Sequence, residues 1–286
     1  MSIFSSPRYG RTRDGWLAAC VGEQAFAMVP HAVSYHLVKA WGLRGPIEDW
    51  CVADFHDGRN DPVDEQSFRA LVEEWASHRR QLASLDRRSI QPRVATPWGP
   101  SHVAVVYGVG IVSHQTASHG GFALTPERNA AIPASLRTKD RFYEEDCAWA
   151  AVAIAFPDLF SDLEKRQADE VLRHIYPAAW EAHHGASLQP GQSRARDRQR
   201  FDADNAGRWV VISAILSNQH PGYVECIATL GGRRVGHPTR DAGQGPVERR
   251  FLVAEERYDI GLHGFVIDED QDRPYDGPSS FVGWTE

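Results

Sequence analysis

Apolar positions in the first third of the chain recur at strand spacing and then at helical spacing. Two short apolar runs, residues 16–21 and 25–29, flank Gly22-Glu23, which is typical of a β-hairpin. Asp61-Pro62 predicts the start of a helix, because aspartate is a favoured N-cap and proline is tolerated in the first turn. The apolar stripe of this helix is expected to consist of Phe68, Leu71, Val72, Trp75 and Leu82.

The middle of the chain begins with strand signals and continues with helix signals. Thr96-Pro97-Trp98-Gly99 punctuates the chain before two β-branched runs, residues 102–107 and 110–113, which predict strands. Thr125-Pro126 predicts another helix start. The alanine-rich segment 144–156 predicts a helix that stops at Pro157.

The clearest helix signal in the chain begins at Ser161. Ser161-Asp162-Leu163-Glu164 is a capping box, in which the first and last side chains bond each other's backbone N–H groups. Gly185 marks the expected end, because glycine readily adopts the left-handed conformation that terminates helices. The apolar stripe between them is Val171, Leu172, Ile175 and Tyr176.

Residues 186–206 carry almost no large apolar side chains, so this segment is predicted to be an exposed linker. Its alternating arginines leave a phosphate-binding strip open as an alternative, although no aromatic residues are interleaved with them. They are Arg194, Arg196, Arg198 and Arg200. Beyond the linker, short β-rich runs alternate with turns, and the chain ends in an acidic tail that we expect to be poorly ordered. The predicted strands are Trp209–Leu216, Tyr223–Leu230, Arg250–Val253 and Gly264–Ile267.

These patterns together predict an α+β protein in which central helices pack on a small sheet and a β-rich module follows. The expected parts are an N-terminal α+β segment (1–90), a central domain (95–185), the linker (186–206) and the C-terminal module (207–286).

Composition and charge narrow the functional class without naming one. The chain has 286 residues and a net charge of -7 at pH 7, which disfavours non-specific coating of nucleic acid. No apolar run approaches the roughly 20 residues that span a bilayer, and Met1–Gly10 lacks a signal-peptide apolar segment. We therefore expect a cytoplasmic protein with no membrane partner. The four cysteines form no C-x-x-C pair, and no P-loop, dinucleotide or G-x-S-x-G motif occurs, so no cofactor is predicted.

One polar constellation in the central domain suggests chemistry. His119 precedes two glycines, and three carboxylates and Cys147 follow at the expected start of the 144–156 helix. If the two segments converge, Cys147 is a candidate nucleophile with His119 as its base, and the helix dipole would favour the thiolate. One carboxylate would orient the imidazole, and the amides of Gly120 and Gly121 would stabilise an oxyanion. The candidate carboxylates are Glu144, Glu145 and Asp146.

The same residues also have structural and metal-binding explanations. The carboxylates would complement the helix dipole, Cys147 would pack as a small buried residue, and His119 would bond a backbone carbonyl. Adjacent carboxylates would also raise the pKa of a thiol. A metal site using His114, His119 and one carboxylate is a third possibility, but the chain has no H-E-x-x-H motif and we predict no metal.

The sequence at these positions resembles a bacterial family known as domain of unknown function 7007 (DUF7007). The resemblance is good over residues 95–185 and looser beyond them. The resemblance rests on Thr96-Pro97-Trp98-Gly99, Gly110-Ile111-Val112, Ser118-His119-Gly120-Gly121, Glu127-Arg128, Tyr143-Glu144-Glu145-Asp146-Cys147 and Ala155-Phe156-Pro157, and then on Gly231-Gly232-Arg233-Arg234 and Gly264-Phe265-Val266-Ile267-Asp268. It implies an accessory protein of plasmids, conjugative elements or phages, for which counter-defence is one suggested role. The matched motifs make Ser118, Gly120, Gly121 and Arg128 candidate binding residues.

Two functional hypotheses follow, and the sequence leaves open whether the protein is an enzyme. The first is an interaction protein that binds a protein or nucleic acid of the host or of the mobile element. The second is a thiol-dependent hydrolase or transferase that uses the Cys147, His119 and carboxylate site. The first is preferred, because burial and capping account for every residue without chemistry.

Overall fold

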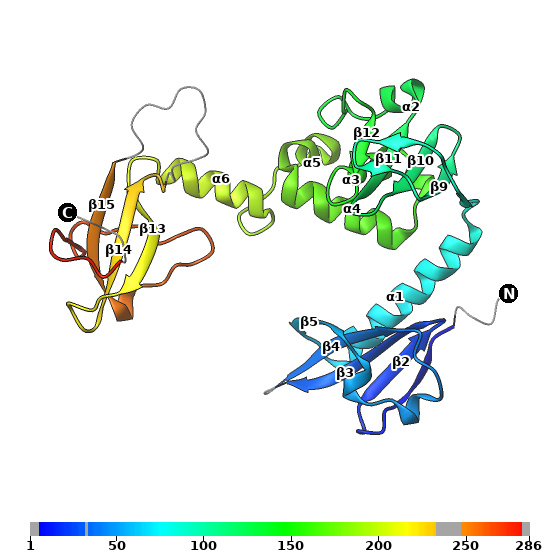
Figure 1. Cartoon of the computed structure of the whole chain (residues 1–286), viewed down its shortest axis with the longest axis horizontal. Helices are drawn as coiled ribbons and strands as arrows, with labels where there is room; N and C mark the ends of the chain where they lie inside the picture. The colour runs from blue at the N-terminus through cyan, green and yellow to red at the C-terminus, as the bar shows by residue number, and fades with distance from the viewer. Residues whose placement is uncertain (1–5, 32–33, 233–246, 282–286) are drawn as a thin grey trace. The chain divides into compact units, whose positions relative to one another are not determined.

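The computed structural model describes residues 6–31, 34–232 and 247–281 (Figure 1). The chain forms two compact units, Met1–Leu172 and Arg173–Glu286. Helices and antiparallel sheets are both present, and the C-terminal region is rich in strands, so the predicted α+β class is confirmed. The domain boundaries given above stay predictions.

The N-terminal sheet contains five antiparallel strands in chain order. They are β1 (Arg8–Arg11), β2 (Leu17–Val21), β3 (Gln24–His31), β4 (Ser34–Trp41) and β5 (Asp57–Pro62). The predicted hairpin is confirmed as β2 and β3, which pair antiparallel through Val21 and Gln24 at the turn. Alternate residues point to opposite faces of a strand. Ala19 and Val21 accordingly enter one core, and Ala18 and Cys20 enter another.

Helix α1 (Glu65–Ser84) packs against one face of this sheet (Figure 1). Phe68 and Val72 of the predicted stripe are buried, together with Ala76, whereas the predicted Leu71 is exposed. The predicted start at Asp61-Pro62 is wrong, because Pro62 is the last residue of β5. The N-cap is Asp64, whose carboxylate accepts the backbone N–H of Ser67 at 2.7 Å.

The central sheet is also antiparallel and five-stranded, in the order β12-β11-β10-β9-β6. Its strands are β6 (Arg88–Ile90), β9 (Val103–Gly108), β10 (Ile111–Gln115), β11 (Gly120–Leu124) and β12 (Phe142–Glu144). The strands predicted at 102–107 and 110–113 are therefore confirmed. The Thr96-Pro97-Trp98-Gly99 turn joins the two-residue strands β7 (Ala95–Thr96) and β8 (Gly99–Pro100).

Two short helices follow β11 and β12. Helix α2 (Pro126–Ala130) is capped by Thr125, as predicted. Helix α3 (Trp149–Ala155) begins later than the predicted residue 144. The early start is wrong because Phe142–Glu144 pairs with β11 as a strand, so Cys147 lies in the turn before the helix.

The predicted capping box at Ser161 is confirmed at the start of α4 (Asp162–Ile175). The Ser161 N–H donates to Glu164 at 2.8 Å, and the Glu164 N–H donates to the Ser161 hydroxyl at 3.2 Å. The single helix expected to reach Gly185 is instead divided. Helix α5 (Pro177–His184) begins after Tyr176, because proline cannot donate the backbone hydrogen bond that a continuous helix needs. Gly185, at φ 63°, ends α5.

The segment predicted as a linker, 186–206, contains helix α6 (Arg194–Asp204) with Ser193 as its N-cap. The alternating arginines lie on this helix, and three of them form ion pairs within it or with α5. Arg196 pairs with Glu181, Arg198 with Asp202 at 2.8 Å, and Arg200 with Asp197 at 3.4 Å. These guanidinium groups are already neutralised, which argues against the phosphate-binding strip.

The C-terminal sheet has the order β13-β14-β15-β16. Its strands are β13 (Trp209–Leu216), β14 (Tyr223–Leu230), β15 (Glu248–Ala254) and β16 (Arg273–Pro274), so three of the four predicted strands are confirmed. The fourth, 264–267, forms only an isolated bridge between Val266 and Val210. Arg233 and Arg234 lie outside the described residues.

Over residues 268–281 the acidic tail makes defined contacts, contrary to the prediction of poor order, and residues 282–286 lie outside the described residues. The buried Asp272 carboxylate accepts from Arg257 at 2.7 Å. The Ser280 N–H donates to the fully buried Glu225 at 2.7 Å, and Arg250 pairs with the same carboxylate at 3.1 Å. Buried carboxylates of this kind need paired donors, and the tail supplies some of them. Over the described ranges, no helix combines the length and apolar character needed to cross a membrane.

Candidate binding site on the central sheet

Strands β11 and β12 bring the two polar segments singled out in the sequence side by side. Gly121 is the register partner of Glu144, and the Glu145 N–H donates to the Gly120 carbonyl at 3.0 Å. The segments 118–121 and 144–147 are therefore neighbours.

His119 lies at the exposed end of this pair of strands, directly before β11. Its backbone is held by Thr116, whose hydroxyl donates to the His119 carbonyl at 2.7 Å. Ser118, beside it, is also exposed. Among the described residues, no hydrogen bond joins the His119 ring to Cys147 or to any carboxylate.

The environment of Cys147 disfavours the thiolate. Partial burial and the negative charges of Glu144 and Asp146 raise the pKa of the Cys147 thiol above its ordinary value. Glu144 accepts the backbone N–H groups of Asp146 and Cys147, which fixes the turn before α3. The helix dipole invoked for Cys147 does not apply in the expected form, because the residue precedes the helix.

Gly120 and Gly121 allow close approach of neighbouring groups. A Cβ on Gly120 would lie 2.5 Å from a carboxylate oxygen of Glu145. A Cβ on Gly121 would lie 2.2 Å from the Tyr143 carbonyl oxygen and 2.5 Å from the Trp98 ring. Glycine is required here by packing, which accounts for the motif without an oxyanion site.

Two further candidates have structural contacts. Arg128 donates to the Val109 carbonyl at 2.9 Å and lies over the Phe156 ring, which ties α2 to the β9–β10 turn. His114 is buried on the sheet face opposite Ser113 and bonds the Ser101 hydroxyl at 3.0 Å. Burial lowers the His114 pKa. Over the part of the chain that the structure describes, no cluster of His, Cys, Asp and Glu has the arrangement of a metal site.

A hollow of about 230 Å³ lies on the sheet face that carries Ser113 and Gln115. Its walls include four aromatic rings from different elements: Tyr107, Phe122, Trp149 and Phe160. Phe160 contacts the other three, with ring centroids 5.3 Å from Tyr107, 5.8 Å from Phe122 and 6.4 Å from Trp149. Polar groups from β10, α4 and the turn after β12 complete the lining.

One cation already occupies this aromatic cluster. The Arg87 guanidinium lies 3.9 Å from the centroid of the Tyr107 ring and donates to both carboxylate oxygens of Glu164, at 2.8 and 2.9 Å. Burial alone would raise the pKa of Glu164, but the hydrogen bonds from Arg87 and Ser161 outweigh burial and lower it. On one side, the hollow is therefore lined by Glu164, a carboxylate that Arg87 already neutralises.

Glu145 supplies the uncompensated charge. Its exposed side chain lines the hollow and lies against Gly120, and it has no ion-pair or side-chain hydrogen-bond partner among the described residues. Of the carboxylates predicted from the sequence, Glu145 lines the hollow, whereas the structure does not place Glu144 or Asp146 in its wall.

Residues 91–206 match the model of DUF7007, a domain of unknown function. The resemblance inferred from the motifs is confirmed for this domain, which covers less than half of the chain, whereas the mobile-element context stays a prediction. No curated protein and no solved structure matches the chain. All residues lining the hollow fall inside the DUF7007 match, but Arg87 lies outside it.

The aromatic residues of the hollow were missed because they share no motif. Tyr107 ends a predicted strand, and Trp149 falls inside the predicted 144–156 helix with no separate role assigned to it. Phe160 follows the turn after Pro157. These aromatic residues come together only through tertiary packing, which cannot be predicted from the spacing of residues along the sequence.

Proposed function

We propose that this protein acts by binding a partner protein, and that the central hollow receives an arginine side chain of that partner. The observation that carries the proposal is Glu145, a carboxylate without an ionic partner among the described residues, at the rim of an aromatic hollow. The partner is a protein of the host or of the mobile element, met in the cytoplasm. The resemblance to DUF7007 is the basis for including a counter-defence role in the proposal.

Aromatic walls and a carboxylate suit a cation. The faces of aromatic rings attract cations, with contributions of about 0.5–1 kcal/mol at exposed sites and more where water is excluded. Arg87 is an intramolecular example of this recognition, because its guanidinium contacts Tyr107 and Glu164 together. An incoming guanidinium would find the Trp149 ring and the Glu145 carboxylate in the same hollow.

Arginine is favoured over lysine, and protein over nucleic acid. The planar guanidinium stacks on rings and forms two parallel hydrogen bonds with a carboxylate, whereas the ammonium group is a strongly hydrated point charge. Phosphate groups would be repelled by Glu145, and nucleic-acid affinity depends on lysine and arginine neutralising phosphates.

The thiol-dependent alternative is less well supported. It requires a thiolate within hydrogen-bond reach of a base. The raised pKa of Cys147, and the absence of a bond to His119 among the described residues, both weigh against it.

Short peptides test the proposal with a defined probe. The full chain is labelled with 5-fluorotryptophan, and the Trp149 resonance is assigned with Trp149→Phe. We expect acetyl-Gly-Arg-Gly-amide to shift this resonance with a Kd of about 1 mM, the weak affinity expected when a single side chain makes the contacts. The matched peptide containing citrulline, which keeps the shape and removes the charge, is expected to bind about 10-fold more weakly, equivalent to about 1.4 kcal/mol.

Two variants serve as a matched pair. Glu145→Gln should lower the affinity for the arginine peptide to that for the citrulline peptide. Asp146→Asn removes the same charge one residue away, outside the hollow wall, and should leave the affinity within about 2-fold. Equal affinities for the arginine and citrulline peptides, or equal losses in the two variants, would contradict the proposal.

A further inference from the structure

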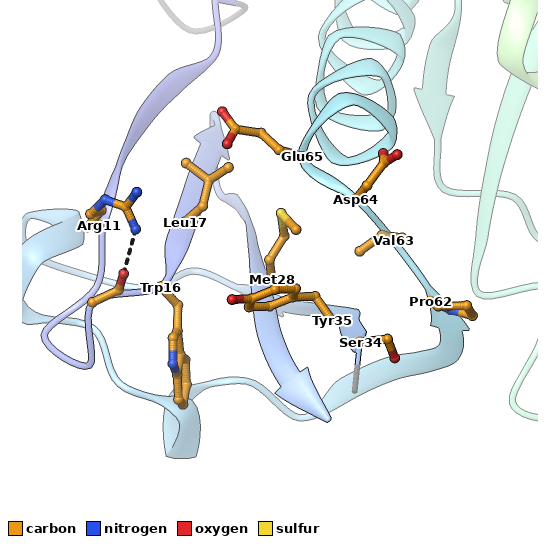
Figure 2. Close-up of a pocket in the computed structure, with 11 residues that line it drawn as sticks. Arg11, Trp16, Leu17, Met28, Ser34, Tyr35, Pro62, Val63, Asp64 and Glu65 are labelled. Atoms are coloured by element: carbon orange, nitrogen blue, oxygen red, sulfur yellow. Dashed lines mark hydrogen bonds between the residues drawn. The ribbon is translucent and has the colours of Figure 1, made fainter. Parts of the chain in front are cut away.

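A second hollow, of about 540 Å³, lies in the N-terminal sheet, outside the DUF7007 match (Figure 2). Its apolar lining comes from the start of β2, the β3–β4 hairpin and the β5–α1 junction. These residues are Trp16, Leu17, Met28, Tyr35, Pro62 and Val63. The volume lies within the range of roughly 300–1,000 Å³ that small-molecule sites occupy.

The lining divides into a buried floor and an accessible rim. Met28 is only 6% exposed and packs into the core formed with α1. Leu17 and Trp16 are half-buried, whereas Tyr35 is 47% exposed. Figure 2 shows the Tyr35 ring beside Met28 in the middle of the group. A flexible thioether beneath an aromatic rim suits an apolar ligand of irregular shape.

Three charged side chains line the hollow, and two of them are already engaged. Asp64 caps α1 by accepting the Ser67 N–H at 2.7 Å, next to the positive end of the helix dipole. Glu65 pairs with Arg69 at 2.8 Å. Both acids belong to the α1 side of the hollow, and Figure 2 shows Asp64 on the opposite side from Arg11.

Arg11 and Asp64 both lack an ion pair within the described ranges, but Asp64 is compensated by the Ser67 N–H and the start of α1, whereas Arg11 contacts only a neutral carbonyl. Its guanidinium donates to the Gly15 carbonyl at 2.8 Å, the dashed contact in Figure 2, and forms no ion pair within the described ranges. The carbonyl uses one of the five N–H donors of a guanidinium and orients the group at the mouth of the hollow. The remaining donors are available to an anion, for which the planar guanidinium is well suited.

We infer that this hollow binds a small organic carboxylate with an apolar or aromatic body. The carboxylate pairs with Arg11, and the body lies over Met28 between Trp16 and Tyr35. The ligand is a metabolite-sized molecule, because the hollow is closed below by buried Met28. This site is independent of the arginine-binding hollow, since the two share no lining residue.

The methionine content of the chain makes the site directly observable. Met28 is the one methionine of the sequence besides Met1, so methyl-¹³C methionine labelling of the full chain gives a Met28 signal, which Met28→Leu assigns. Titration with 4-phenylbutyrate should shift this signal. The neutral 4-phenylbutanamide should bind at least about 10-fold more weakly, because it cannot form an ion pair.

Variants on one strand provide the control. Arg11→Gln should bring the affinity for 4-phenylbutyrate down to that for the amide. Arg8→Gln, at the other end of β1 and outside the lining, should leave it within 2-fold. Both residues are exposed, and unchanged circular dichroism and melting temperature would confirm that both variants fold.

Three results would overturn the inference. They are no Met28 shift with 4-phenylbutyrate at 10 mM, equal affinities for the acid and the amide, or tighter binding of 4-phenylbutylamine than of the acid. The last result would assign the dominant charge to Asp64 and Glu65 instead of Arg11. Because the probe carries no guanidinium, none of these results bears on the arginine-binding proposal.

Discussion

The two five-stranded sheets of this chain each carry a hollow, and the hollows differ in the sign of the charged side chain that no neighbouring charge or helix start compensates. In the central sheet, a small aromatic hollow presents Glu145. In the N-terminal sheet, a larger apolar hollow presents Arg11. Strand residues line part of both hollows, but the uncompensated charged side chain sets the sign of the expected ligand. A hollow is therefore better characterised by its uncompensated charge than by its size.

Glycine substitution should give the largest contrast between the two hollows. Gly121 in the central sheet has φ 155° and no room for a Cβ, whereas Gly15, which lines the N-terminal hollow, has φ 83° and nothing within 4 Å. Gly121→Ala should lower the free energy of unfolding by about 4 kcal/mol, because backbone strain and overpacking add. Gly15→Ala should cost about 1 kcal/mol from strain alone.

Urea titration measures the stability loss in each glycine variant, and amide hydrogen exchange shows which strands are affected. Exchange in β10 to β12 should accelerate in Gly121→Ala, and exchange in β2 should accelerate slightly in Gly15→Ala. Equal losses in the two variants would show that the close packing around Gly121 has no energetic consequence.

Ion pairs should give a smaller contrast. Arg87 and Glu164 are 13% and 17% exposed, whereas Arg69 and Glu65 in the N-terminal region are 45% and 61% exposed. Glu164→Gln should lower the free energy of unfolding by about 2 kcal/mol, because Arg87 is left half-buried without its partner. Glu65→Gln should cost less than about 0.5 kcal/mol, as expected for an exposed pair.

The pH dependence of the same variants sharpens this comparison. The pKa of Glu164 is lowered in the folded protein, so its contribution to stability is present above the ordinary glutamate pKa of about 4.3 and is lost as the pH falls through the folded value. The stability difference between the natural chain and Glu164→Gln should therefore shrink on acidification below about pH 4. A stability difference that stays constant down to pH 2 would contradict the stabilising role assigned to the ionised Glu164 carboxylate.

The smallest expected effect concerns Cys147. The raised thiol pKa makes Cys147 less reactive. Iodoacetamide should therefore alkylate Cys147 several-fold more slowly than it alkylates free glutathione at pH 7.5, which mass spectrometry of the labelled peptide measures. Cys147→Ala should bind the arginine peptide as the natural chain does. Alkylation faster than glutathione would restore the thiol-dependent hypothesis.

Local sequence patterns predicted those elements whose cause is local. The Ser161 capping box and the Thr125 N-cap were predictable because a side chain and a backbone group a few residues apart suffice to form them. The helix predicted from residue 144 was wrong because β11 recruits Phe142–Glu144 as a strand partner. Asp64 displaced Asp61 as the N-cap for a similar reason, since β5 extends through Pro62.

The candidate sites were predictable only in part. The sequence raised the convergence of segments 118–121 and 144–147 only as a condition, and Glu145 was among the residues named. The arginine-binding proposal differs from the thiol hypothesis because it depends on Trp149 and Phe160, which come from separate elements that no motif connects. The N-terminal hollow left no polar signature in the sequence, because its lining reads as ordinary core residues.

The Arg87 contact has a consequence for where this domain starts as an autonomous unit. Tyr107 and Glu164 lie within residues 91–206, but the guanidinium that covers the ring and neutralises the acid is supplied from upstream. A truncated polypeptide beginning at residue 91 would expose the Tyr107 ring and leave the half-buried Glu164 carboxylate without its cation. Expression boundaries for an isolated fragment therefore belong ahead of Arg87, within or before α1.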